Sequence, residues 1–114
     1  MQTRTRVDVS HYSYRVTWSA EDDEFIATCL EFPSLSWLAP TQIEALQGLE
    51  AVVNDVLADM AEQGEKTPVP FSDRTYSGTF NVRIGEGLHR DLVVRAAEDG
   101  LSLNQYVVKK LASA

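Results

Sequence analysis

The sequence predicts an α+β protein in two parts, a small β-β-β-α domain followed by a strand-helix-helix segment that dimerises through its strand. Three observations predict this fold class. Apolar residues alternate with period two before residue 40 and again over 79–84. Apolar residues recur at helical spacing over 41–64 and after residue 85. Acidic residues are concentrated in the first part: residues 1–75 hold 5 Lys and Arg against 13 Asp and Glu, and residues 76–114 hold 5 against 4.

The composition is typical of a folded protein with two kinds of partner. Of the 114 residues, 44% are hydrophobic and 24% are charged, as in ordinary globular chains. The unequal charge of the two parts, within a net charge of -7, suggests modules with different partners. The single cysteine, Cys29, fits a reducing compartment. The sequence shows no signal peptide and no apolar run of bilayer length, so we expect a cytoplasmic protein without a membrane partner.

The N-terminal part begins with three predicted strands. Residues 12–18 alternate apolar and polar side chains, which predicts a half-buried strand. A polar break over 19–23 separates it from residues 25–32, a second and more buried strand, so the pair is expected to form a hairpin. A short third strand is expected over 35–38, after Pro33.

A long helix follows these strands. Thr41 and Glu44 have the spacing of a capping box, in which each side chain accepts from the other residue's backbone N–H. Gly64 is placed to end the helix in the left-handed conformation. The predicted apolar face of this helix consists of Leu46, Leu49, Val53, Val56, Leu57 and Met60.

We therefore draw the first domain over residues 11–66, a linker over 67–77 and the second domain over 78–114. Residues 65–70 contain two prolines and break the periodicity, which predicts either a short edge strand near Val69 or a stiff linker. We favour the linker.

The second domain is predicted as one strand and two helices. Residues 79–84 alternate strictly, residues 88–99 have helical spacing that ends at Gly100, and Ser102 and Gln105 form a second capping box at the start of a last helix. A lone strand with two short helices has too little apolar surface to close a core. The strand can add to the N-terminal sheet or pair with the same strand of a second chain. We favour the second, with a dimer core of Phe80, Val82 and Ile84.

Such a dimer would place polar side chains where DNA can be bound. The outer face of the paired strands would carry Thr79, Asn81 and Arg83, side chains suited to base edges in the major groove, which admits a two-stranded ribbon. The start of the last helix, at Ser102, Leu103 and Asn104, would offer backbone N–H groups to a phosphate. A solvated surface strand would alternate in the same way, and the two helices that follow in register favour DNA binding.

Two segments resemble known families. Residues 79–84 together with 96–105 resemble the ribbon-helix-helix repressors, and the resemblance covers 77–114. Residues 14–18, 25–33, 41–46 and 68–70 resemble the HicB antitoxins. In that family a degenerate RNase H-like domain blocks a small basic RNA-cleaving toxin, HicA, and a C-terminal module represses the shared operon.

The resemblance implies a type II antitoxin with operator DNA and a HicA-like toxin as partners, acting as a homodimer or a higher even oligomer. It does not say which N-terminal residues contact the toxin. A stand-alone transcriptional regulator, whose N-terminal domain senses a ligand or sets the oligomeric state, is the alternative. An active nuclease over residues 12–64 is disfavoured, because metal-dependent cleavage needs carboxylates from separate strands.

We expect no catalytic residue, no metal site and no cofactor. Glu21, Asp22, Asp23 and Glu24 are consecutive, which favours a solvated turn that can also attract a basic partner. His11 and His89 have no second ligand at metal spacing, and Cys29 has no nearby base that would activate it. Trp18 and Trp37 are expected as core or interface aromatics.

Overall fold

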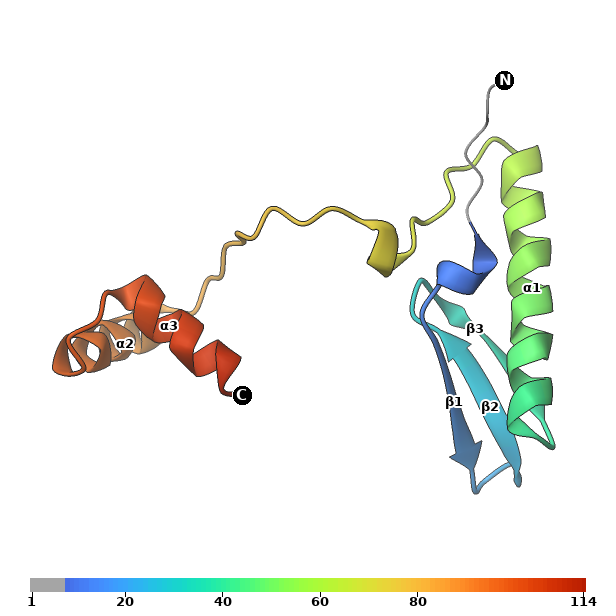
Figure 1. Cartoon of the computed structure of the whole chain (residues 1–114), viewed down its shortest axis with the longest axis horizontal. Coiled ribbons are helices and arrows are strands. Elements are labelled where there is room, and N and C mark those ends of the chain that lie inside the picture. Colours follow the sequence, from blue (N-terminus) through green and yellow to red (C-terminus); the bar gives the residue numbers. More distant parts are fainter. Residues whose placement is uncertain (1–7) are drawn as a thin grey trace. The chain divides into compact units, whose positions relative to one another are not determined.

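The structure, a computed structural model, describes residues 8–114 and divides after Tyr76 into two compact units. Unit 1 ends at Tyr76 and unit 2 is Ser77–Ala114. Both contain regular elements (Figure 1), which confirms the α+β class. None of the helices in the described residues combines the length and apolar character needed to cross a bilayer. The elements are the 3-10 helix η1 (Val9–His11), the strands β1 (Tyr14–Ser19), β2 (Glu24–Cys29) and β3 (Phe32–Ala39), the helix α1 (Gln42–Glu62), the 3-10 helix η2 (Phe71–Asp73), and the helices α2 (Glu86–Glu98) and α3 (Leu103–Ala112).

The three strands form one antiparallel sheet in the order β1-β2-β3. Val16 pairs with Ala27, and Ala27 pairs with Trp37 on the other side. The turn between β1 and β2 contains Asp23 at φ 55°, a left-handed conformation that Asp tolerates better than most residues. The predicted hairpin is therefore confirmed.

The boundary between the second and third strands differs from the prediction. The strand expected over 25–32 ends at Cys29, and the strand expected over 35–38 already begins at Phe32. Leu30 and Glu31 form a tight turn between them, and the register shifts between Thr28 and Cys29. Continuous apolar character concealed this turn, because the pattern there contains neither glycine nor a run of polar residues.

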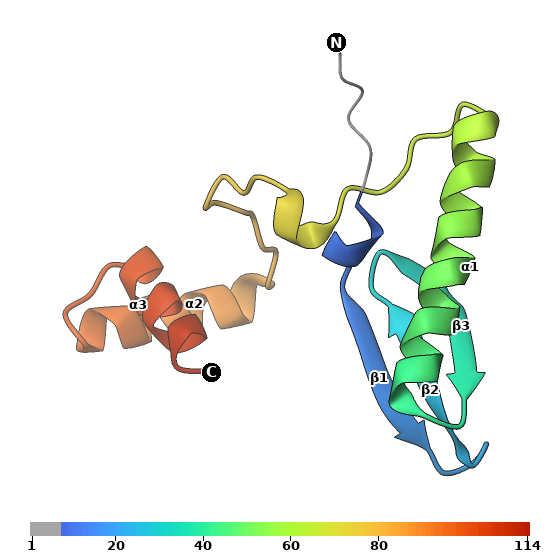
Figure 2. The ribbon, with the colours of Figure 1, turned by 45° about the vertical axis from the view of Figure 1, so that its right-hand side comes forward.

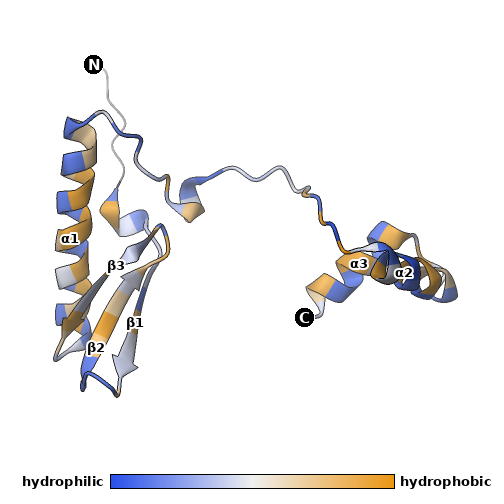
Figure 3. Cartoon of the chain, turned by 180° about the vertical axis from the view of Figure 1, so that it is seen from behind, coloured by the Kyte–Doolittle hydropathy of each residue, from blue (hydrophilic) through white to orange (hydrophobic). Residues whose placement is uncertain are grey.

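Helix α1 covers one face of the sheet (Figure 2). Its residues Ala45, Leu49 and Val53 are fully buried against Ala27 and Cys29 of β2 in one hydrophobic cluster. Most of the large apolar residues of α1 lie on its sheet-facing side, Ile43 being exposed, and its outer side is largely polar (Figure 3). The other face of the sheet is solvated, as is common in antiparallel sheets. Its exposed residues are Arg15, Thr17, Thr28, Ser36 and Leu38.

The ends of α1 follow local signals in the sequence. The Thr41 hydroxyl oxygen accepts from the Glu44 N–H at 3.1 Å, as predicted. The Glu44 carboxylate, however, accepts from the Thr41 hydroxyl at 2.8 Å and not from its backbone N–H, so the expected reciprocal capping box is only half formed. At the other end Gly64 has φ 71°, and the Glu65 N–H donates to the Met60 carbonyl at 2.8 Å, which satisfies a terminal carbonyl.

Gly48 in α1 allows Trp37 of β3 to pack directly on the helix backbone. A Cβ at position 48 would overlap the Trp37 indole ring. We predict that Gly48→Ala destabilises unit 1 by about 1–3 kcal/mol through overpacking, although Ala is the better helix former by about 1 kcal/mol. Urea unfolding followed by tryptophan fluorescence measures the change. Gln47→Ala is the control, because Gln47 is an exposed position of the same helix; a stabilised Gly48→Ala protein would contradict the prediction.

The segment after α1 is neither an edge strand nor a free linker up to Asp73. Residues 65–70 have no regular structure, since Pro68 and Pro70 have no N–H to donate to a ladder. Residues 68–74, which we call the strap, are instead bound to the start of the sheet. The Tyr12 hydroxyl donates to the Pro68 carbonyl at 2.7 Å, and the Ser72 hydroxyl donates to the His11 carbonyl at 3.3 Å. The linker expected over 67–77 is thus part of unit 1 up to Tyr76.

Candidate nucleic-acid interface

Unit 2 contains the two predicted helices. Helix α2 begins at Glu86, two residues before the predicted start, with Gly85 at φ 85° as its N-cap residue. It ends at Glu98, where Gly100 at φ 70° lets the Leu101 N–H donate to the Ala96 carbonyl at 2.9 Å. The glycine stop is therefore confirmed.

The start of α3 is a complete capping box. The Ser102 hydroxyl oxygen accepts from the Gln105 N–H at 3.1 Å, and the Gln105 side-chain oxygen accepts from the Ser102 N–H at 2.9 Å. Fewer N–H groups are therefore free at this helix start than the sequence suggested. The Ser102 N–H is already used, which leaves the N–H groups of Leu103 and Asn104 and the Ser102 hydroxyl for an anion at this positive end of the helix.

The strand predicted over 79–84 is not formed in the single chain. Residues 79–84 have no regular secondary structure, and the sheet of the described residues contains only β1, β2 and β3. The segment has therefore not added to the N-terminal sheet, which was one of the two alternatives. A strand needs the backbone of a neighbour, and the other alternative would supply that neighbour from a second chain.

The three side chains expected to contact bases are all exposed. Thr79 is locally engaged: its N–H donates to the Ser77 hydroxyl oxygen at 3.2 Å, and the Ser77 hydroxyl donates to the Thr79 carbonyl at 3.0 Å. Among residues 8–114, neither the Asn81 nor the Arg83 side chain has a hydrogen-bond partner or an ion-pair partner. Both are available to an external ligand.

Unit 2 exposes most of its large apolar side chains. Phe80 is 76% exposed and Val82 is 63% exposed, whereas only Ala96 and Tyr106 are buried in this unit. Leu88 and Val93 of α2 and Leu111 of α3 are exposed as well. Such a surface on so small a unit is unfavourable in water, and burial of apolar area against a partner would stabilise it. The exposed set is Phe80, Val82, Ile84, Leu88, Val93, Val94, Val108 and Leu111.

The other candidate residues belong to unit 1. Glu21, Asp22 and Asp23 form the turn between β1 and β2. In residues 8–114 no three His, Cys, Asp or Glu side chains converge as metal ligands would. Cys29 is buried, and its burial raises the pKa of the thiol. Trp18 and Trp37, expected as core or interface aromatics, are about half exposed.

Residues far apart in the sequence meet at Glu31, a buried carboxylate that the sequence analysis did not identify. Its Oε1 accepts from the Ser13 N–H at 2.9 Å, and its Oε2 accepts from the Ser13 hydroxyl at 3.1 Å and from the Phe71 N–H at 2.9 Å. Burial raises the pKa of Glu31, but the hydrogen bonds from Phe71 and Ser13 outweigh it, so the net pKa is lowered. The sequence signal for this site was a carboxylate within the largely apolar strand predicted over 25–32.

His11 and Asp73 also connect η1 to the strap. The His11 Nδ1 and an Asp73 carboxylate oxygen are 2.8 Å apart, and this hydrogen bond raises the pKa of the imidazole. The helix η1 is thereby held beside the strap, and the carboxylate of its N-cap residue Asp8 accepts from the Ser10 N–H at 2.9 Å.

Comparison with known proteins places the similarity mainly in the C-terminal part. Residues 61–111 match the model of the HicB family, a little under half of the chain. No curated protein and no solved structure matches this chain significantly. The match supports membership of the HicB family and is consistent with an antitoxin role. The motifs that suggested HicB in the sequence lie over 14–70, whereas the match begins at the end of α1 and extends into α3.

Proposed function

We propose that this chain is the antitoxin of a type II toxin-antitoxin system. Unit 1 would bind and neutralise a small basic HicA-like mRNA-cleaving toxin, and unit 2 would dimerise and repress the operon by binding operator DNA. The observation that carries the proposal is the HicB family match over residues 61–111, which includes the exposed segment 79–84 and both helices of unit 2.

The DNA-binding half of the proposal follows from the exposed apolar residues of unit 2. Pairing residues 79–84 of two chains would satisfy their backbone groups and bury Phe80, Val82 and Ile84 of both copies. The side chains of Thr79, Asn81 and Arg83 would then project from the outer face of a ribbon that fits the major groove. The N-terminal end of α3 would hold a phosphate, which positions the ribbon without specifying sequence.

The toxin-binding half is supported by the charge of unit 1. Helix α1 carries five carboxylates and neither Lys nor Arg. Asp59 and Glu62 lie near its C-terminal end, where the helix dipole disfavours negative charge. A cationic partner would relieve this repulsion, and complementary charge would speed its encounter with unit 1. The proposal assigns no catalysis to the chain.

The proposal is tested with the full-length protein and the product of the neighbouring reading frame. We expect the chain to shift its own promoter DNA and to retain the small basic neighbour in stoichiometric amount during affinity purification. The chain should also suppress RNA cleavage by that neighbour. A shift without capture would identify a stand-alone regulator, and the absence of any shift would refute the role of unit 2.

Arg83→Ala is expected to weaken specific DNA binding by about 1–3 kcal/mol and to relax the base preference, because a guanidinium can bond two acceptors of guanine. Fluorescence anisotropy with the operator and with single-base variants measures both effects. Arg90→Ala in α2 is the matched control, since it removes the same charge from unit 2 outside the segment 79–84. Unchanged affinity and preference in Arg83→Ala would show that this residue makes no base contact.

A further inference from the structure

The strap carries an arginine whose side chain is fixed in place. The Arg74 Nε donates to the Val69 carbonyl at 2.9 Å, and the guanidinium carbon lies 3.8 Å from the centroid of the Phe71 ring. Phe71 is itself held through its N–H by Glu31. Arg74 is therefore ordered by contacts that begin at a buried carboxylate, and little side-chain entropy remains to be lost when it binds a ligand.

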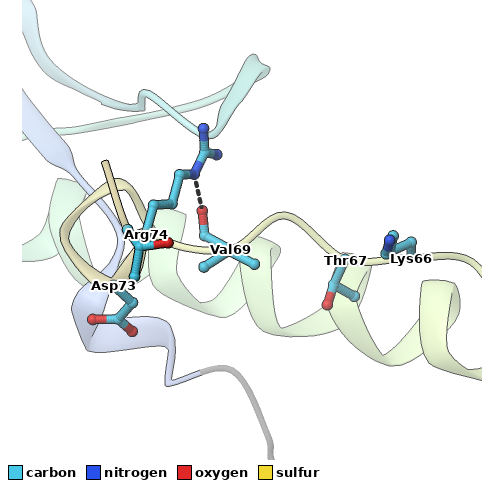
Figure 4. A pocket seen from close by; sticks show the side chains of 6 residues that line it. Lys66, Thr67, Val69, Asp73 and Arg74 are labelled. Atoms are coloured by element: carbon cyan, nitrogen blue, oxygen red, sulfur yellow. Dashed lines mark hydrogen bonds between the residues drawn. The ribbon is translucent and has the colours of Figure 1, made fainter. Parts of the chain in front are cut away.

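The two terminal nitrogens of Arg74 are free of protein acceptors within residues 8–114. Figure 4 shows the Nε directed at Val69 and the terminal nitrogens directed away from the strap. A guanidinium presented in this way can donate two parallel hydrogen bonds to the oxygens of one phosphate.

Arg74 borders an open depression of about 540 Å³, lined by Lys66, Thr67, Val69, Asp73, Arg74 and Thr75. Lys66 adds a second cation, and the threonines add hydroxyl groups. Asp73 is the opposing charge, but its carboxylate is engaged by His11 at 2.8 Å. In residues 8–76 the only Lys or Arg outside this depression is Arg15. Two of the three Lys and Arg residues in 8–76 thus lie where the chain leaves unit 1.

We propose that this depression is a second DNA contact, in which Arg74 binds a backbone phosphate beside the bases contacted by residues 79–83. This inference rests on the proposed function. Thr79 lies five positions after Arg74, and an extended chain spans at most about 3.6 Å per residue. When Thr79 lies in the major groove, Arg74 is therefore within about 18 Å, a reach that includes the phosphates along a groove about 12 Å wide.

The test compares full-length Arg74→Ala, Arg74→Lys and Arg15→Ala proteins in salt titrations with operator DNA and with a random duplex. We expect Arg74→Ala to bind both duplexes more weakly, with the same base preference as the unaltered protein. The slope of log affinity against log salt should fall by about 0.9 per lost phosphate contact, hence by about 2 for a dimer. Arg74→Lys should keep the slope but lose affinity, because an ammonium cannot form the two-pronged contact.

Arg15→Ala is the matched control, because Arg15 is an exposed arginine on β1 of the same unit. Equal losses of affinity in Arg15→Ala and Arg74→Ala would show a general charge effect and overturn the site.

A normal salt slope in Arg74→Ala, with operator binding intact in the unaltered protein, would overturn the inference alone. Absence of DNA binding by the unaltered protein would overturn the proposed function as well. Loss of toxin capture by Arg74→Ala with unchanged DNA binding would assign the depression to the protein partner. Amide exchange at Phe71 checks that the strap is intact in each variant.

Discussion

Phe80→Asp is expected to leave the full-length chain monomeric and unable to bind operator DNA. Phe80 is 76% exposed in the single chain, so its substitution removes little packing within unit 2. In the proposed dimer each Phe80 would be buried, a contribution of about 1.5–3 kcal/mol per side chain. A carboxylate in that shared core would add a desolvation penalty of several kcal/mol per ion. Together these effects exceed what a small interface tolerates.

Sedimentation equilibrium over a range of concentrations measures the effect on association. Ile43→Asp is the matched control, because Ile43 is 69% exposed on α1 and its substitution adds the same charge to unit 1. That variant should dimerise normally. A Phe80→Asp protein that dimerises with unchanged affinity would place the interface away from the segment 79–84 and would remove the basis for a DNA-binding ribbon.

The helices were predictable because their signals are local. Thr41 with Glu44 and Ser102 with Gln105 act over three residues, and glycines at 64 and 100 mark the two helix ends that precede a turn. Their physical causes lie within one helical turn, so no tertiary information is needed. The predicted alternation of β1 is similarly local, and its burial pattern alternates from Tyr14 to Thr17.

The elements that were not predicted depend on distant or external partners. The strap is fixed by hydrogen bonds from residues about 60 positions away, such as His11 to Asp73, and the sequence contains no pattern with that spacing. The turn at Leu30 and Glu31 depends on the same contacts, since Glu31 binds Ser13 and Phe71. The segment 79–84 has the alternation of a strand, but pairing requires a neighbour that a single chain does not supply.

The residues predicted for DNA contact could be predicted from the sequence only in part. Sequence alternation assigned Thr79, Asn81 and Arg83 to one polar set, and their exposure is compatible with that assignment. The use of the Ser102 N–H by Gln105 could not be anticipated from the anion-binding argument alone, although the capping box itself was recognised. The capping box and the predicted phosphate site both require the Ser102 N–H. In the structure this N–H donates to the Gln105 side-chain oxygen.

Glu31→Ala is expected to lower the free energy of unfolding of unit 1 by about 3 kcal/mol. The substitution leaves the partly buried N–H groups of Ser13 and Phe71 without their acceptor, and a donor left unpaired on burial costs about 1–3 kcal/mol. Urea unfolding followed by tryptophan fluorescence isolates unit 1, because both tryptophans, Trp18 and Trp37, lie in it. Glu65→Ala is the matched control on an exposed carboxylate; equal stability of the two variants would show that the Glu31 hydrogen bonds contribute nothing net.

The pH dependence gives this prediction a second and independent measurement. Hydrogen bonds from Phe71 and Ser13 outweigh burial and hold the pKa of folded Glu31 below its ordinary value of 4.5. The folded state therefore binds this proton less readily than the unfolded chain. The stabilisation is fully present above about pH 4.5 and is lost as the pH falls through the lower folded pKa. The stability difference between the unaltered protein and Glu31→Ala should accordingly narrow in acid. Curves that remain parallel down to about pH 3 would mean that the carboxylate charge is not what holds the strap.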